Sequence, residues 1–330
     1  MTLVDIAGSG LAELTCARLL AERGHRFRLA APPAPGGARP LLLTGPTLEL
    51  LGSLWDDRLL DGGRSLSHRR VRWGSGAKPT RFPQPARAVD GAELTARIRD
   101  RLGPGNRSTD PPAWTVTAAA PTDGSALLSA GRRSLLAGTA PLRRRRDRST
   151  AELGCAELGW VHLTPLGGDD CLVQAMVPGP AAHPAALLER ILGESGLADR
   201  LGGPPSTVVA LAAAPRVHLA PARPPAAGEP GRLVVGAGAL RQDPLSGTGT
   251  AQALRTAILA ASVIDAAARG RPASGLCAHY TRRLRVAFHD HLRTCLRLYE
   301  TAFPTGAWRD EIDATRRALR PRAPLAQPAP

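Results

Sequence analysis

Apolar and polar positions follow two distinct periods along the chain, and these periods predict its elements. Residues 2–7 form a short apolar run typical of a buried strand, and residues 11–24 carry apolar side chains at the spacing of one helix face. Gly24 is expected to end this helix, and the alternation in residues 25–31 predicts a second strand. The chain therefore opens with a strand–helix–strand unit.

Strand patterns dominate the middle of the chain, with helical patterns between them. Residues 68–83 alternate like a hairpin whose turn lies at Gly74–Gly76. Residues 155–166 and 171–178 predict two antiparallel strands joined by a Gly-Gly-Asp-Asp turn. Further strands are predicted within 114–120, 125–130 and 208–220, and helices within 44–60, 90–103 and 184–201.

The C-terminal third contains a strand, a glycine-rich loop and a helix in residues 233–262, followed by a long helix over 279–303. Apolar side chains recur along the long helix every three or four residues, which predicts a face that packs on a core. These side chains are Tyr280, Leu284, Phe288, Leu292, Cys295 and Tyr299.

This order of elements is typical of an α/β dinucleotide-binding domain interrupted by a sheet-based domain. We predict a discontinuous Rossmann-like cofactor domain, a β-rich substrate domain and a C-terminal helical segment that ends in a proline-rich tail. Their respective ranges are 1–75 with 88–140 and 228–275, then 76–87 with 141–227, and then 276–330.

Composition narrows the classes of function. The chain has 330 residues, 43% of them hydrophobic, which is enough for a sizeable core, and it has no apolar run of membrane-spanning length. No basic region followed by a long apolar stretch opens the chain, so we expect a cytoplasmic protein. The net charge of +15 comes almost wholly from arginine, without zinc-finger spacing or an RNA-binding signature, so we expect no nucleic-acid partner.

Cysteine and histidine spacing gives no metal site. The five cysteines are an odd number, lie far apart and form no C-x-x-C pair, which argues against a disulfide framework and indicates a reducing compartment. His289 and His291 are the one close pair of histidines, and residues two apart on a helix point in different directions.

The first candidate site is the turn after the first strand. Gly8 and Gly10 match the first two positions of G-x-G-x-x-G, in which backbone amides at a helix N-terminus approach a pyrophosphate. A strand–turn–helix junction needs glycines without a ligand as well, so both interpretations stay open. Glu13 stands at the third glycine position, and residues 29–31 lack the acidic side chain that normally binds a ribose hydroxyl.

The second candidate site is the loop before the helix of residues 249–262. It contains Gly236 and Ala237 and then Asp-Pro-Leu-Ser-Gly-Thr-Gly over residues 243–249. This segment resembles FAD-dependent monooxygenases of the p-hydroxybenzoate-hydroxylase and tryptophan-halogenase superfamily. Those proteins have a Gly-Asp pair at the end of a strand and then a proline-containing glycine loop that opens a helix. Amides of such a loop can face the flavin and stabilise negative charge on the reduced ring.

Other segments agree with the resemblance in the expected order but lack carboxylates. Residues 129–134 resemble the third motif of the family without its Asp, and residues 159–178 resemble the strand pair of the substrate domain. Arg39 stands where relatives often place an arginine near the FAD phosphates, and Ala237 replaces the Asp of the Gly-Asp pair. A lost charge-assisted hydrogen bond costs about 1.5–3 kcal/mol, so two would weaken FAD binding roughly a hundredfold.

The resemblance implies an FAD-binding domain of the GR2 type interleaved with a β-sheet substrate domain, and a monooxygenase that hydroxylates an aromatic ring. NAD(P)H or a reductase would supply electrons. The substrate would be an aromatic small molecule, a peptide or a protein, and one branch of the superfamily modifies a peptidyl tryptophan in tryptophylquinone biogenesis. The implied cofactor residues are Gly8, Ser9, Gly10, Leu11, Ala12, Arg39, Gly236, Asp243, Pro244, Gly247, Thr248 and Gly249.

Other functions remain as alternatives. The missing carboxylates leave open a degenerate, non-catalytic flavoprotein relative that acts as a binding or maturation factor. A halogenase is less well supported, because its lysine would have to be Lys78 in a predicted turn and residues 159–166 lack the second tryptophan of W-x-W-x-I-P. No Gly-x-Ser-x-Gly elbow follows a strand, so a Ser-His-Asp hydrolase is not expected.

Overall fold

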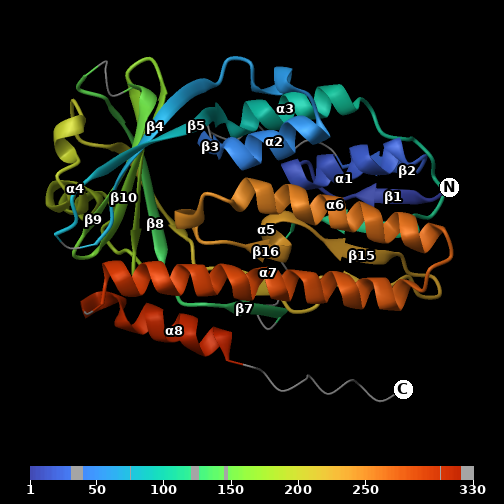
Figure 1. The fold of residues 1–330 in the computed structure, drawn as a ribbon. Helices are drawn as coiled ribbons and strands as arrows, with labels where there is room; N and C mark the ends of the chain where they lie inside the picture. Colours follow the sequence, from blue (N-terminus) through green and yellow to red (C-terminus); the bar gives the residue numbers. More distant parts are fainter. Residues whose placement is uncertain (31–39, 75, 120–125, 145–147, 305, 321–330) are drawn as a thin grey trace.

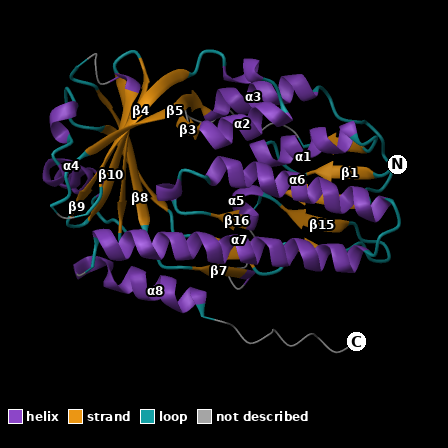
Figure 2. Ribbon diagram, in the orientation of Figure 1, coloured by secondary structure: helices purple, strands orange, loops and turns teal. Residues whose placement is uncertain are grey.

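The computed structural model describes residues 1–30, 40–74, 76–119, 126–144, 148–304 and 306–320. Its strands form three sheets, of five, eight and three strands. Figure 2 shows the strands of the largest sheet gathered at one end of the molecule, while helices cover the other end. The predicted α/β class is confirmed.

The five-stranded sheet is built around the N-terminal strand. β1 pairs in parallel with β2 on one side and with β6 on the other, and β15 pairs in parallel with β6. Parallel pairing places the carboxyl ends of β1, β6 and β15 at one edge of this sheet. The strands, in spatial order, are β14 (Ala222–Arg223), β15 (Gly231–Val234), β6 (Trp114–Thr117), β1 (Leu3–Ile6) and β2 (Arg26–Leu29).

The eight-stranded sheet is mostly antiparallel. It contains both predicted hairpins, since β4 pairs with β5 and β10 pairs with β11 in antiparallel register. The single strand predicted over residues 155–166 is wrong at its start, because one strand ends at Ala156 and the next begins at Gly159 after a turn. Helix α4 covers one face, where its buried leucines and isoleucine pack on β10 and β11. In spatial order the strands are β12 (Ser206–Ala212), β8 (Ser134–Pro141), β11 (Asp170–Val177), β10 (Gly159–Gly167), β9 (Thr150–Ala156), β4 (Arg64–Arg72), β5 (Thr80–Asp90) and β3 (Pro40–Thr44).

The single strand predicted over residues 208–220 is wrong, because the chain changes sheets within it. β12 belongs to the eight-stranded sheet, and β13 (Arg216–His218) joins β7 (Leu127–Ser129) and β16 (Leu240–Arg241) in the three-stranded sheet. Pro215 has no amide proton to continue a ladder, and its carbonyl accepts from the Ala130 amide at 2.9 Å.

The predicted helices form, with small differences at their ends. The helical pattern of residues 44–60 becomes an α-helix followed by one 3-10 turn. The helices are α1 (Leu11–Glu22), α2 (Gly45–Leu54), η1 (Asp57–Leu60), α3 (Gly91–Leu102), α4 (Pro184–Ser195), η4 (Ala198–Arg200), α5 (Gly236–Ala239), η5 (Pro244–Ser246), α6 (Gly249–Ala268), α7 (Ala273–Ala302), η6 (Gly306–Trp308) and α8 (Arg309–Leu319).

Helix α6 is long and apolar enough to cross a membrane by length and composition, and half of its apolar window is buried in the protein. It packs between α1 and α7, which accounts for its apolar composition.

Helix α7 connects the two larger sheets (Figure 1). The apolar stripe predicted along it is confirmed, since all six side chains are buried. Its first part, including Tyr280 and Phe288, packs in the core of the five-stranded sheet. Its last part, including Cys295 and Tyr299, packs on Trp160 and Met176 of the eight-stranded sheet. The same apolar face of α7 therefore packs against both sheets.

A buried ion cluster lies beside the C-terminal part of α7. The Arg133 guanidinium is 1% exposed and donates to Asp243 at 2.5 Å, to Glu311 at 3.1 Å and to the Thr315 hydroxyl at 2.6 Å. The Tyr299 hydroxyl donates to the same Asp243 carboxylate at 3.0 Å. Burial lowers the pKa of Arg133, but Asp243, Tyr299 and Glu311 raise it by more, so its net pKa rises and the side chain stays charged.

We expect Arg133→Leu to destabilise the protein by about 3–5 kcal/mol, because it leaves the buried carboxylates of Asp243 and Glu311 without their partner. The free energy of unfolding in urea measures this loss. The matched control is Arg132→Leu, since Arg132 is exposed and its replacement should change stability by no more than about 0.5 kcal/mol. Equal effects of the two substitutions would contradict the importance of the cluster.

Candidate functional site

The carboxyl edge of the five-stranded sheet brings the two glycine segments together. The Ala7 amide donates to the Val116 carbonyl and the Val235 amide to the Thr117 carbonyl, each at 2.8 Å, so both segments leave the sheet side by side. Gly236 adopts a φ of 58°, and a Cβ atom there would lie 3.2 Å from the Ala12 methyl group. The structure thus joins Gly8–Ala12 with Gly236, as a cofactor site on this sheet requires.

The space at the first glycine motif is filled by the side chain of Glu13. Its carboxylate accepts from the Gly10 amide at 2.9 Å and from the Ala118 amide at 2.7 Å. A Cβ atom at Gly8 would lie 1.9 Å from Glu13 Oε1, and one at Gly10 would lie 2.7 Å from Oε2. Glu13 is 4% exposed, and burial raises its pKa although the two amides lower it.

The loop over residues 243–249 has a different character, because its glycines face open space. Gly247 (φ 62°) and Gly249 are exposed, and no atom lies within 4 Å of a Cβ built on either of them. Hydrogen bonds within the loop hold it: the Leu245 amide donates to Asp243 at 2.9 Å, and the Thr248 hydroxyl donates to the Gln242 side chain at 2.6 Å. The two glycines that lead into α6 are therefore exposed at the surface.

Other residues assigned to the site lie in varied positions. Ser9 and Leu11 are half-buried beside the first motif, and Pro244 begins η5. The Asp243 carboxylate points into the protein, toward Arg133. Arg39 falls outside the described residues.

Lys78 is exposed in the loop between β4 and β5, which agrees with its expected place in a turn. Among the described residues, no group of three or more His, Cys, Asp and Glu side chains is placed to hold a metal ion.

Aromatic side chains fill the region between the eight-stranded sheet and the C-terminal helices. The Trp160 indole donates to the Tyr299 hydroxyl at 3.0 Å, and the Tyr299 ring stacks on Trp308 with centroids 4.4 Å apart. Phe303 stacks on Trp308 at 4.9 Å, and Trp73 contacts Phe303 edge-on at 6.1 Å. We call Trp73, Trp160, Tyr299, Phe303 and Trp308 the aromatic cluster.

His162 lies two residues beyond Trp160 on β10, on the same face of the sheet. It stands at the place of the second tryptophan of the halogenase motif. Its Nδ1 atom is 3.1 Å from the Thr164 hydroxyl, and its buried Nε2 atom has no hydrogen-bond partner among the described residues. Burial, with a smaller effect of the Arg69 charge, lowers the pKa of His162 to about 3, so the ring is neutral at physiological pH.

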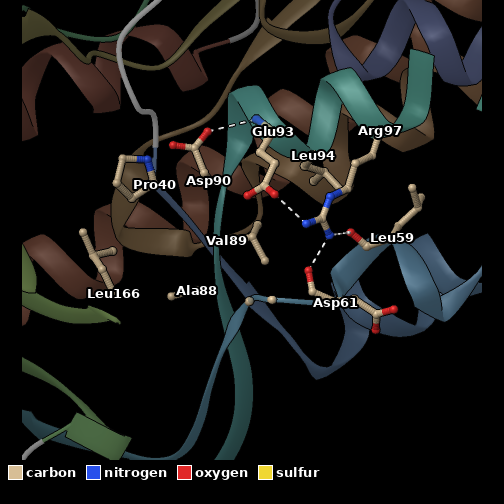
Figure 3. Close-up of a pocket in the computed structure, with 12 residues that line it drawn as sticks. Pro40, Leu59, Asp61, Ala88, Val89, Asp90, Glu93, Leu94, Arg97 and Leu166 are labelled. Carbon is tan, nitrogen blue, oxygen red and sulfur yellow. Dashed lines mark hydrogen bonds and ion pairs between the residues drawn. The ribbon is translucent and has the colours of Figure 1, made fainter. Parts of the chain in front are cut away.

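A separate cavity of about 240 Å³ lies between α3 and the ends of β3 and β5 (Figure 3). Three of its polar side chains already have partners. Asp90 caps α3 by accepting from the Glu93 amide at 3.0 Å, and the Arg97 guanidinium donates to the Glu93 carboxylate and the Asp61 carbonyl. The lining contains none of the predicted cofactor residues, so this cavity is not part of the candidate site.

The residues that sequence reasoning missed are those whose partners are distant in the chain. Glu311 and Thr315 carry no local motif, and Arg133 was assigned only to a motif segment. Tyr299 was assigned to a packing face, while its hydroxyl also contacts Asp243.

No family model matches this chain, and no curated protein sequence matches it significantly. Solved structures do match. CmlS, a flavin-dependent halogenase, is 18% identical with a TM-score of 0.76, covering 96% of this chain and 69% of CmlS. QhpG, a peptidyl tryptophan dihydroxylase essential for tryptophylquinone cofactor biogenesis, is 17% identical with a TM-score of 0.77, covering 96% and 78%.

HpxO of Klebsiella pneumoniae, solved with FAD and uric acid, is 14% identical with a TM-score of 0.68, covering 96% of this chain and 92% of HpxO. The chain therefore has the fold of FAD-dependent halogenases and hydroxylases, as the sequence resemblance implied.

The two ends of the candidate site differ in how they suit FAD. The open loop at residues 243–249 could face a flavin ring with the amides at the start of α6. The helix terminus at Gly10 could not bind a pyrophosphate while the Glu13 carboxylate occupies it. A pyrophosphate would need the same Gly10 amide and the same space that the carboxylate already takes. With Glu13 in this position, the residues present do not fit the diphosphate part of the cofactor.

We expect His162→Leu to make the protein less sensitive to acid. Because the pKa of His162 is about 3 when folded and 6.5 when unfolded, its neutral form favours folding fully above pH 6.5, and this contribution is lost as pH falls toward 3. Between pH 7 and about pH 4.5 the wild-type protein should lose about 2–3 kcal/mol more than the variant in urea unfolding. His183→Leu, at an exposed position, is the control and should lose as much as the wild type.

Proposed function

We propose that this chain is a flavin-dependent oxidoreductase that hydroxylates an aromatic substrate. The observation that supports this most is the exposed glycine loop of residues 243–249 at the start of α6, within a fold shared over 96% of the chain with FAD-dependent enzymes. The loop has the same order of strand, glycine loop and helix as the resemblance implied. FAD, bound weakly, would be the cofactor, and NAD(P)H or a reductase would be the electron donor.

The substrate is an aromatic small molecule or a tryptophan within a peptide or partner protein. Likeness to QhpG, which acts on a peptidyl tryptophan, supports the second class. The net charge of +15 would also favour the approach of an acidic partner, because opposite charges accelerate encounter.

A second candidate is a non-catalytic relative that keeps the fold and acts as a binding or maturation factor. Two specific observations favour it. The Glu13 carboxylate fills the helix terminus at Gly10, and the aromatic cluster is packed, with Trp308 fully buried.

Flavin binding separates the two candidates. The purified protein is examined for flavin absorbance near neutral pH and then titrated with FAD, with quenching of flavin fluorescence as the readout. Saturable binding supports the oxidoreductase. Absence of binding at high micromolar FAD would refute it and leave the non-catalytic candidate.

We expect Ala237→Asp to lower the dissociation constant for FAD by about tenfold, because it restores a carboxylate at an exposed position beside the loop, and one charge-assisted hydrogen bond is worth about 1.5–3 kcal/mol. Fluorescence titration measures the constant. Ala227→Asp adds the same charge at an exposed position between β14 and β15 and should leave the constant unchanged. An unchanged constant in Ala237→Asp would count against this role of the loop.

A further inference from the structure

The Glu13 side chain does more than cap its own helix. A glutamate at the third position of a helix commonly accepts from the N-cap amide, and the contact between Glu13 and the Gly10 amide is of this kind. The second oxygen, however, accepts from the Ala118 amide just beyond β6, which is 105 residues away in the chain. The carboxylate therefore links the segment after β1 to the segment after β6 by accepting a hydrogen bond from one backbone amide of each.

This arrangement reproduces what a bound phosphate would do at the same place. Phosphates bind at glycine-rich helix N-termini by accepting from backbone amides with the positive end of the helix dipole behind them. Glu13 offers two anionic oxygens at the N-terminus of the 12-residue helix α1, and both accept from amides. Its Oε1 atom lies 1.9 Å from where a Cβ atom at position 8 would stand, so the carboxylate fills the room that Gly8 leaves free.

We propose that Glu13 is an internal anionic ligand that occupies the pyrophosphate site and competes with FAD for it. Binding of FAD then requires the Glu13 side chain to leave both amides, which its flexible carboxylate end allows. The affinity for any ligand with a diphosphate is set by this competition, whereas contacts of a flavin ring with residues 243–249 are independent of it. The proposal deepens the flavin-dependent function above and rests on it for the identity of the cofactor.

The test compares three ligands that divide FAD into its parts. FAD has both the diphosphate and the flavin, ADP has the diphosphate alone, and riboflavin has the flavin without any phosphate. Dissociation constants are measured by calorimetry for the wild-type protein, Glu13→Ala and Glu13→Gln. The matched control is Glu22→Gln, which removes a charge on the same helix at a half-exposed side chain paired with Arg18.

In Glu13→Ala, we expect affinity for FAD and for ADP to rise about tenfold or more, and affinity for riboflavin to stay within about twofold of wild type. Glu13→Gln removes the charge and keeps the volume, so its gain should be smaller and confined to the same two ligands. Glu22→Gln should bind all three ligands as the wild type does. Thermal unfolding without ligand checks that each variant is folded, and Glu13→Gln alone suffices should Glu13→Ala fail to fold.

Two results would overturn the proposal: no gain for FAD or ADP in a folded Glu13 variant, or an equal gain for riboflavin, which would indicate general loosening of the site. Its failure is distinguishable from failure of the proposed function. Wild-type protein that binds FAD as tightly as the Glu13 variants refutes the competition and leaves the function intact. A gain for ADP without flavin binding by any variant upholds the competition and refutes the function.

Discussion

The buried charge of Arg133 is the interaction on which the rest of the structure depends. A guanidinium that is 1% exposed must be paired, since removing a charge from water costs several kcal/mol. Its ionic partners are Asp243, just before η5, and Glu311 of α8, and the guanidinium also lies over the ring of Tyr299 of α7, 4.7 Å from its centroid. The requirement to pair this one charge therefore fixes how the C-terminal helices sit against the start of β8.

The buried ion cluster around Arg133 also includes Asp243, the first residue of the loop in the candidate site. Asp243 uses its carboxylate for Arg133 and for the Leu245 amide, while its own amide donates to His291 Nε2 at 2.8 Å. Leu245 in turn packs against the aromatic cluster. The glycines that follow in the loop are exposed, and no atom lies within 4 Å of a Cβ atom built on Gly247.

The two helix N-termini of the candidate site, at α1 and at α6, differ in whether a side chain of the protein already occupies them. At the start of α6 Gly247 and Gly249 are exposed, whereas at the start of α1 the Gly10 amide already donates to the Glu13 carboxylate of the same helix. Anions are stabilised at both places by the helix dipole. The difference is that one anion is built into the chain and the other would have to come from a ligand. The chain therefore shares its fold with FAD-dependent halogenases and hydroxylases, while a single side chain, Glu13, fills the helix terminus at Gly10.

Local spacing was sufficient for much of this structure. The periods of apolar residues predicted the longer helices except α8, both hairpins and the buried stripe of α7, because side-chain direction in a helix or strand follows from the backbone repeat. The glycine segments and the missing carboxylates were also visible in the sequence. They identified the fold correctly through resemblance.

Only the tertiary structure decided which groups the buried charged side chains contact. The sequence showed Glu13 in place of a glycine, but its second contact is the Ala118 amide just beyond β6, and no local pattern predicts a contact between residues 105 positions apart. Likewise the chain changes sheets near Pro215 because Ala130 and Arg133 approach it from far away in sequence. By itself the sequence determined most of the elements and where the two glycine segments lie in the chain, since both depend on neighbouring residues. Whether the site is open or filled depended on side chains brought together by folding.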